Sequence, residues 1–151
     1  MPSKYADNTS VSVDRSKAEV EKILTKYGAD QFSSGWTGDK IVVMFRMNNR
    51  YIRIEMSTPT KGDIGRVIRG GYSVEEKVAA ENRRRWRALV LYVKAKLESV
   101  ESNIISFEEA FMAHIILPNG KTVGQFMQPQ IESAYKSGEM PTLLSEFRRS
   151  A

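Results

Sequence analysis

The sequence predicts an α+β fold, in which a three-stranded antiparallel β-meander packs against a long helix, with an N-terminal helix and short C-terminal helices. Three observations predict this fold. A β-rich stretch, "QFSSGWTGDKIVVMFRMNNRYIRIEM", contains two turn signals. Residues 73–101 carry an apolar stripe at helical spacing. Ser or Thr stands three residues before Glu or Gln at several places, which is the spacing of a helix-capping box.

The first helix is expected over residues 14–27, after a polar segment, residues 1–13, that we expect to be flexible. Ser16 and Glu19 have capping-box spacing, and Gly28 is a natural helix terminator. Apolar residues recur at positions i, i+3, i+4 and i+7, namely Val20, Ile23, Leu24 and Tyr27. The segment therefore predicts an amphipathic helix with one buried face.

The meander is predicted from its two turn signals, Gly38-Asp39 and Asn48-Asn49. If each is a two-residue turn, apolar residues face one another on neighbouring strands, because cross-strand partners share a face of the sheet. The expected pairs are Phe45 with Ile52, Val43 with Ile54, Ile41 with Met56, Trp36 with Ile41, and Phe32 with Phe45. One apolar face then needs a helix to cover it.

The opposite face of the same hairpin pairs Arg46 with Tyr51 and Met44 with Arg53. Interleaved arginine and aromatic side chains can contact phosphates and stack on bases. The alternative is an ordinary solvated face, since an antiparallel sheet commonly leaves one face in water. The sequence leaves both interpretations open and makes the solvated face the more frequent case.

The connection over residues 58–72, "TPTKGDIGRVIRGGY", contains one proline and four glycines. Its glycines lack the spacing of a phosphate-binding loop, and "RGG" occurs in it only once. We expect a flexible basic loop that carries Lys61, Arg66 and Arg69.

The long helix is expected to begin after Ser73 and to end near residue 101. Its apolar stripe consists of Val78, Ala79, Trp86, Leu89, Val90, Val93, Leu97 and Val100. Trp86 lies at the centre of this stripe, with arginines at four of the six nearest positions. The stripe predicts that Trp86 anchors the core and is not a base-stacking platform.

The charges of this helix separate when roughly 100° is allowed per residue. Arg83, Arg87 and Lys94 then fall on one flank of the stripe, Arg84 lies further round, and Arg85 is on the opposite flank. A narrow apolar strip at the back of the helix is expected to receive the C-terminal helices or a second subunit, and consists of Ala88, Leu91 and Ala95.

The C-terminal third predicts short helices. Capping-box spacing marks two starts, Ser106 with Glu109 and Thr122 with Gln125. Pro129 predicts a kink or a break in the second of these helices. Beyond them, two apolar residues are expected to pack back onto the body, Leu143 and Leu144.

Catalytic chemistry is not predicted. His114 is the only histidine, cysteine is absent, and neither a helical zinc motif nor a nucleophile elbow occurs. A partly buried structural role is expected for His114. We therefore expect a protein that is not an enzyme and that holds no cofactor or metal.

Size and composition favour one domain over residues 14–151 of this 151-residue chain. No apolar run approaches the roughly 18 residues needed to span a bilayer, and the N-terminus lacks a signal-peptide core. The lack of cysteine fits a reducing compartment. We expect a cytoplasmic location and no membrane partner.

Three stretches carry a resemblance to known proteins: "TSVSVDRSKAEVEKILTKYGAD", "RRRWRALVLYVKAKLESVES" and "SFEEAFMAHIILPNGKTVGQFMQPQIESAYKSGEMPTLL". Together they resemble small proteins carried by bacteriophages and prophages, a group without an established activity. The resemblance implies a bacterial host cell and an accessory role. It transfers no functional residue.

The positive charge lies in the middle of the chain. Residues 40–96 contain fourteen Lys and Arg against five Asp and Glu, a net charge of +9, whereas the whole chain carries +5. This segregation predicts a non-catalytic accessory protein that binds nucleic acid. The alternative is a protein-binding phage or prophage module, either an inhibitor of a host protein or a structural subunit. The residues expected to contact nucleic acid are Arg46, Tyr51, Arg53, Arg66, Arg69, Arg83, Arg84, Arg87 and Lys94.

Overall fold

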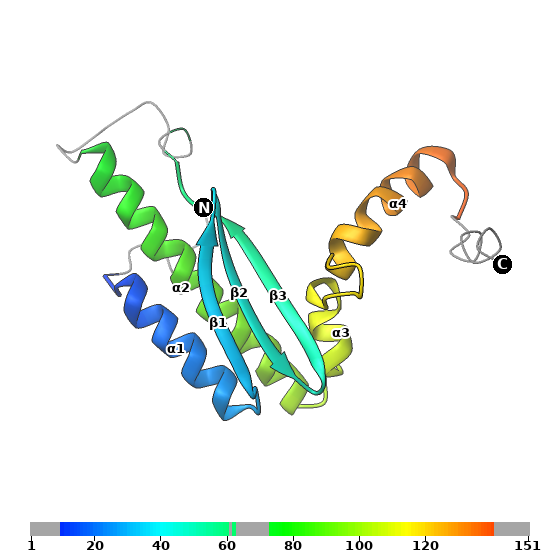
Figure 1. Ribbon diagram of the computed structural model, residues 1–151, viewed down its shortest axis with the longest axis horizontal. Coiled ribbons are helices and arrows are strands. Elements are labelled where there is room, and N and C mark those ends of the chain that lie inside the picture. Colours follow the sequence, from blue (N-terminus) through cyan, green and yellow to red (C-terminus); the bar gives the residue numbers. More distant parts are fainter. Residues whose placement is uncertain (1–9, 61, 63–72, 141–151) are drawn as a thin grey trace.

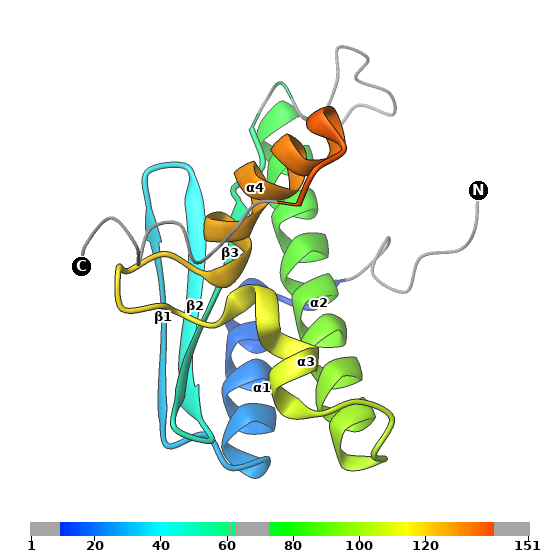
Figure 2. The same cartoon turned by 90° about the vertical axis from the view of Figure 1, so that its right-hand side faces the viewer.

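The computed structural model describes residues 10–60, 62 and 73–140. Its described part confirms the α+β class: helix α1, a three-stranded antiparallel sheet, the long helix α2, and helices α3, η1 and α4. Helices α1 and α2 lie on one face of the sheet, and α4 extends away from the other elements (Figures 1 and 2). Within the described part, no helix is long and apolar enough to span a membrane.

Helix α1, Val13–Lys26, begins three residues before Ser16, the first residue of the expected capping box. Its N-cap is Ser12, whose hydroxyl accepts a hydrogen bond from the Arg15 amide at 3.2 Å. The capping role expected for Ser16 is wrong, because Ser16 lies on the core-facing side of the helix and is fully buried. The expected end of this helix, residue 27, lies one residue after the observed end at Lys26. Gly28 follows with a φ of 108°, a conformation that glycine adopts readily.

The sheet has the strand order β1-β2-β3, with β1 at Gln31–Thr37, β2 at Lys40–Met47 and β3 at Arg50–Ser57. All five expected cross-strand pairs are present, including Phe45 with Ile52 and Trp36 with Ile41. The two-residue turns between the strands contain positive φ angles at Gly38, Asn48 and Asn49. Such turns match the twist of a hairpin, which is why local sequence set the register correctly.

Helix α2, Val74–Glu101, covers the apolar face of the sheet and starts with a capping box between Ser73 and Glu76. Trp86 is 2% exposed, so its expected core position is confirmed. The core joins α2 to α1, to β2 and β3 and to α3, and its buried members from α2 are Trp86, Leu89, Val90, Val93 and Leu97. Trp36 departs from expectation: it shares the apolar face but is 76% exposed, because β1 is an edge strand.

The chain continues through α3, Phe107–Phe111, and η1, Met112–His114, into α4, Val123–Ser137. The expected starts at Ser106 and Thr122 are confirmed. Helix α4 continues through Pro129, so the chain does not break there. Leu143 and Leu144, like most of the 58–72 connection, lie outside the described residues.

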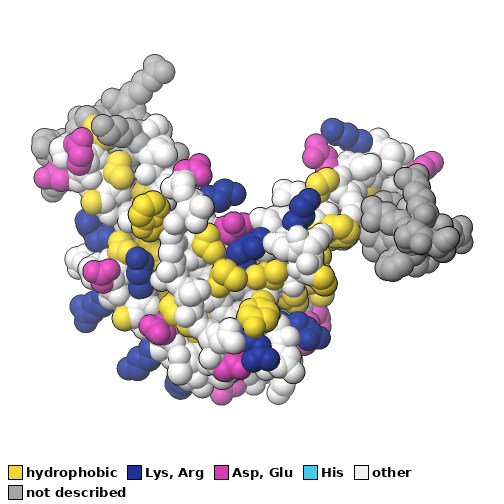
Figure 3. Space-filling model, viewed as in Figure 1, with side chains coloured by type: hydrophobic (Ala, Val, Ile, Leu, Met, Phe, Trp, Pro, Cys, Tyr) yellow, Lys and Arg dark blue, Asp and Glu magenta, His cyan; other side chains and the backbone are white. Residues whose placement is uncertain are grey.

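The first turn of α4 is attached to the rest of the molecule by close packing and a hydrogen bond. Gly124 packs against the Ala113 carbonyl, where an added Cβ would lie 3.1 Å from the oxygen. The side chain of Gln125 donates a 2.6 Å hydrogen bond to Glu55 on β3. Beyond this turn the helix stands off, and Figure 3 shows a notch between it and the rest of the molecule. Ile131 and Tyr135 are 51% and 88% exposed on this free part.

Candidate nucleic-acid interface

The strand pair Arg46 and Tyr51 lies on the outer face of the sheet. The Arg46 guanidinium forms an ion pair with Asp30 and donates a 2.8 Å hydrogen bond to the Asn49 side chain. It also lies 5.9 Å from the centre of the Tyr51 ring, which is 48% exposed. Arg46 is therefore held by neighbouring groups at the end of the β2–β3 hairpin.

Arg53, also on the outer face, attaches the start of α4 to the sheet. Its Nη2 donates to the Gly120 carbonyl at 2.9 Å and to Gln125 Oε1 at 3.0 Å. Because Gln125 in turn bonds Glu55, these four residues form one chain of hydrogen bonds between β3 and α4. The contacts of Arg53 are those of a structural residue.

The strand arginines and the helix arginines do not share a face. Arg46 and Arg53 alternate along their strands with the buried residues Phe45 and Ile52, so they point away from α2. The sheet lies between the two groups. A single basic surface that contains all the sequence-predicted residues is therefore not formed, and Arg66 and Arg69 lie outside the described residues.

The helix arginines are divided between the two flanks of α2, as the helical spacing predicts. Arg84 Nη2 donates to Glu81 at 2.7 Å, and Arg85 donates both to Glu81 and, at 2.8 Å, to the Ser57 carbonyl at the end of β3. Arg87 faces α1 instead. Its guanidinium donates two hydrogen bonds, of 2.7 and 2.9 Å, to the carboxylate of Glu19.

The Glu19 carboxylate lies among several cations. The hydrogen bond from Arg87 lowers the pKa of Glu19, and burial opposes this; the charges of Arg87, Lys94 and Arg15 lower the pKa further. The same pair raises the pKa of Arg87. The side chain of Arg87 is 16% exposed and that of Glu19 is 39% exposed, so the pair lies at the surface between α1 and α2.

Further basic side chains of α1 and α2 lie near this pair, among them Arg15 and Lys94. Helices α1 and α2 run parallel, because Glu19 meets Arg87 and Tyr27, further along α1, meets Glu98 at 3.3 Å. At roughly 100° per residue, Arg15 and Lys22 lie on the same side of α1 as Glu19. We call this surface the basic helix face, and it consists of Arg15, Glu19, Lys22, Arg83, Arg87 and Lys94.

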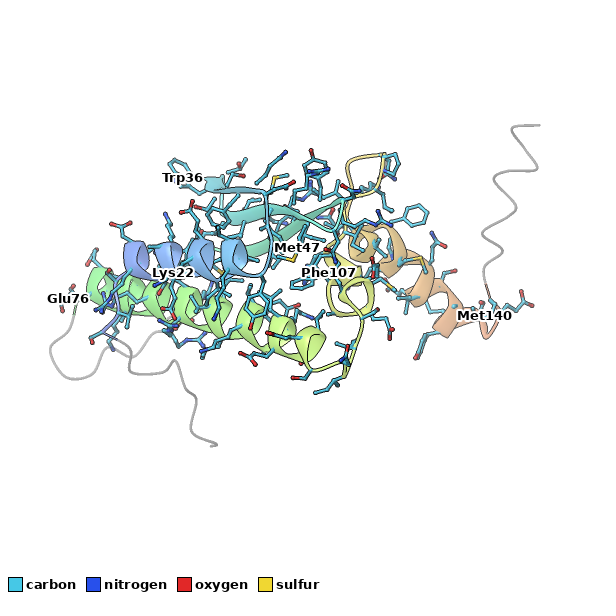
Figure 4. The ribbon with its side chains drawn as sticks, turned by 90° about the horizontal axis from the view of Figure 1, so that it is seen from below. Lys22, Trp36, Met47, Glu76, Phe107 and Met140 are labelled. Carbon is cyan, nitrogen blue, oxygen red and sulfur yellow. The ribbon has the colours of Figure 1, made fainter. Side chains whose placement is uncertain are left out.

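The figures show the position of this face. Figure 4 labels Lys22 where α1 and α2 lie side by side. In Figure 3, basic side chains follow the border of the molecule formed by α1. Arg15, Lys22 and Lys94 are exposed, and Arg83 is partly exposed. Of the sequence-predicted residues, the structure thus brings together Arg83, Arg87 and Lys94.

Two members of the basic helix face, Arg15 and Lys22, were absent from the sequence prediction. They belong to residues 1–39, whose six acidic and five basic residues give a net charge of −1. Averaging over that segment concealed them. Their spacing of seven residues, with Glu19 between them, was the available signal, because residues seven apart share one side of a helix.

The basic helix face ends near the C-terminal ends of α1 and α2. There the hydroxyl of Tyr27 lies beside two carboxylates, Glu98 and Glu101. A hydrogen bond to Glu101, with burial and the charges of both carboxylates, raises the pKa of Tyr27 to about 12. Negative charge therefore limits the extent of the basic surface in this direction.

A cavity of about 540 Å³ lies near the opposite end of the helices. It is mainly apolar, with Trp86, Trp36 and Ile41 among its walls. Lys17 lies in its lining with Nζ 5.2 Å from the centre of the Trp86 ring. The titratable groups among its described lining residues are Lys17 and Glu75.

His114 packs against α2. Its Nε2 and the Tyr92 hydroxyl are 2.6 Å apart, and the two rings meet edge to face. Burial lowers the pKa of His114, and the positive charge of Lys96 lowers it further. Across residues 10–60, 62 and 73–140, no three His, Cys, Asp or Glu side chains are grouped as metal ligands.

The apolar strip of Ala88, Leu91 and Ala95 is not where α3 and η1 pack. Those elements meet the flank of α2 that carries Tyr92 and Lys96, where Lys96 Nζ donates a 2.6 Å hydrogen bond to the Ala110 carbonyl. Leu91 and Ala95 stay exposed.

Comparison with known proteins adds no assignment: no protein-family model, no curated protein and no solved structure matches the chain.

Proposed function

We propose that this protein binds nucleic acid without catalysing a reaction, through the basic helix face. The observation that carries the proposal is the set of cations around Glu19. Arg15 and Lys94 are exposed, and both contribute to the low pKa of that single carboxylate. The face as defined has five basic side chains and one acidic side chain, a formal net charge of +4.

The geometry suits contacts to a phosphate backbone. Arg83 and Lys94 are eleven residues apart on one helix, a distance of roughly 16 Å at 1.5 Å per residue. Arg15 and Lys22 run beside them on a parallel helix. Two parallel rows of cations meet a line of phosphates without reading base edges, so binding is expected to depend little on sequence.

The roles within the face differ. Arg87 is engaged by both oxygens of Glu19, so we assign it to holding α1 and α2 in place. We assign phosphate contact to Arg15, Lys22, Arg83 and Lys94. An accessory role of this kind also fits the resemblance to bacteriophage and prophage proteins.

The test is a fluorescence-polarisation titration with single- and double-stranded oligonucleotides from 50 to 200 mM salt. Four phosphate contacts predict that affinity falls about 50-fold for single strands and about 150-fold for duplexes over this range. Lys94→Gln should weaken binding to every sequence and reduce the salt slope by about 1.

The matched control is Lys136→Gln, which removes the same charge from α4, where Lys136 is 78% exposed and paired with Glu132. It should leave affinity and salt slope nearly unchanged. No binding at 50 mM salt, or equal losses in the two variants, would contradict the proposal.

A second candidate function is protein binding through α4. It is favoured by the exposed apolar side chains of Ile131 and Tyr135 on a helix that stands off from the body. In the same titration this function predicts no nucleic-acid signal. It also predicts a protein partner whose capture from nuclease-treated bacterial lysate tolerates high salt and is lost on Tyr135→Ser.

A further inference from the structure

Strand β1 is an edge of the sheet that no other described strand covers. The opposite edge, on β3, is partly covered, because the Ile116 amide donates to the Tyr51 carbonyl at 2.9 Å and Ile115 bridges to Ile52. No described residue pairs with the outer side of β1. Natural edge strands are commonly protected by charged side chains or proline. The β1 sequence, "QFSSGWT", contains neither.

The hydrogen-bonding groups on the free side of β1 can be assigned. Thr37 and Lys40 close a two-residue turn, so they form a hydrogen-bonded pair. Bonded and non-bonded pairs then alternate along an antiparallel ladder. The amides and carbonyls of Phe32, Ser34 and Trp36 therefore point outward, away from β2.

The side chains of these same three residues lie on the face that α1 and α2 cover. Trp36 is paired with Ile41, which is 5% exposed, yet Trp36 itself is 76% exposed. A tryptophan that shares the apolar face but lacks a neighbour on its outer side leaves a large apolar area in water.

We propose that two copies of this chain associate by pairing their β1 strands antiparallel, with the two-fold axis at Ser34. Residue numbers that pair across the axis then sum to 68, so Phe32 of each copy faces Trp36 of the other. This register uses only the outward-pointing groups of β1 and forms six backbone hydrogen bonds. Each exposed tryptophan gains an aromatic cross-strand partner on its own face of the sheet.

The self-complementarity of β1 favours a second copy over an unrelated peptide. A two-fold interface requires the same patch to fit itself, and the order aromatic, Ser, Ser, Gly, aromatic does so about its centre. The product is a continuous six-stranded sheet. Figures 1 and 2 show β1 at the sheet edge remote from α3 and α4, with α1 beside it on the covered face of the sheet.

The decisive experiment places charged side chains at the two-fold axis of the proposed dimer. Ser34 is exposed and faces its own counterpart, so Ser34→Lys or Ser34→Glu places like charges directly opposite each other. Sedimentation equilibrium should show a concentration-dependent dimer for the unaltered chain. Either variant should raise the dimer dissociation constant by up to about fivefold. An equimolar mixture of the two variants should restore dimers, because opposite charges then meet.

The control is Ser33→Lys, which adds the same charge on the other face of the sheet, beside Gly35 of the second copy. It should leave the dimer intact, and circular dichroism should show that all variants are folded. A second measurement is tryptophan emission, which should shift to the blue on association because Trp36 leaves water. A monomer at all concentrations, or a dimer that Ser34→Lys and Ser34→Glu leave unchanged, would overturn the proposal.

Discussion

At the scale of single residues, the two tryptophans show how the environment decides the role of a side chain. Trp86 is 2% exposed among the core residues of α2, and Trp36 is 76% exposed at the end of an edge strand. Both residues lie on apolar faces of their elements. They differ because Trp86 is covered by α1 and the sheet, whereas no described strand lies beyond β1.

This contrast makes a prediction about stability. Trp86→Ala should lower the free energy of unfolding by about 3–5 kcal/mol, since it removes a large side chain from a packed core. Trp36→Ala should cost less than about 1 kcal/mol at concentrations where the chain is monomeric. Urea unfolding followed by circular dichroism measures both. Equal losses would show that Trp36 is covered in solution.

At the scale of elements, the contact between α1 and α2 contributes both to stability and to the surface proposed to bind nucleic acid. The Arg87–Glu19 pair joins the two helices with two hydrogen bonds at their shared surface. The same carboxylate is the one negative charge of the basic helix face. Stability and anion binding should therefore respond to Glu19 in opposite directions.

A double-mutant cycle with Glu19→Gln and Arg87→Gln tests this. The coupling free energy should be about 1 kcal/mol, and it should shrink in high salt because Glu19 is partly exposed. Glu19→Gln alone should bind oligonucleotides more tightly than the unaltered protein while unfolding at lower urea. Weaker oligonucleotide binding by a folded Glu19→Gln variant would argue against the basic helix face.

At the scale of the whole molecule, the lowered pKa values of His114 and Glu19 predict part of the way stability varies with pH. Burial and Lys96 lower the pKa of His114, so the unfolded chain takes up its proton first as the pH falls below 6.5. Stability is then lost as the pH falls from 6.5 toward the folded pKa of His114. Glu19 adds a second loss below pH 4.5, since its folded pKa is also lowered.

The expected profile is a fall in midpoint temperature between pH 7 and pH 5, followed by a steeper fall below pH 4.5. His114→Gln should flatten the first part and leave the second. Glu19→Gln should reduce the second part and leave the first. Thermal unfolding in buffers of equal ionic strength separates them, and a first part that persists unchanged in His114→Gln would exclude His114 as its cause.

The sequence by itself determined the elements, the strand register and the main core anchor. These features depend on short-range rules: two-residue turns with positive φ at Gly38 and Asn48 fix the pairing of adjacent strands, and helical spacing directs Trp86 inward. The same helical spacing placed Arg83, Arg87 and Lys94 on one flank of α2. Capping residues predicted the helix starts at Ser73, Ser106 and Thr122 correctly, whereas the same spacing at Ser16 did not mark a helix start.

Only the tertiary structure decided which charges meet. The Arg87–Glu19 pair joins residues 68 apart in sequence, and Arg53 reaches Gln125 over 72 residues. Charge counts along the chain cannot assign such partners, because a carboxylate can pair with any cation that folding brings to it. The packing of α1 beside α2 also added Arg15 to the basic surface and put the sheet between that surface and Arg46. The periodicity of a helix or strand determines which way a side chain points from its own element. The packing of the elements against one another determines which residues that side chain meets.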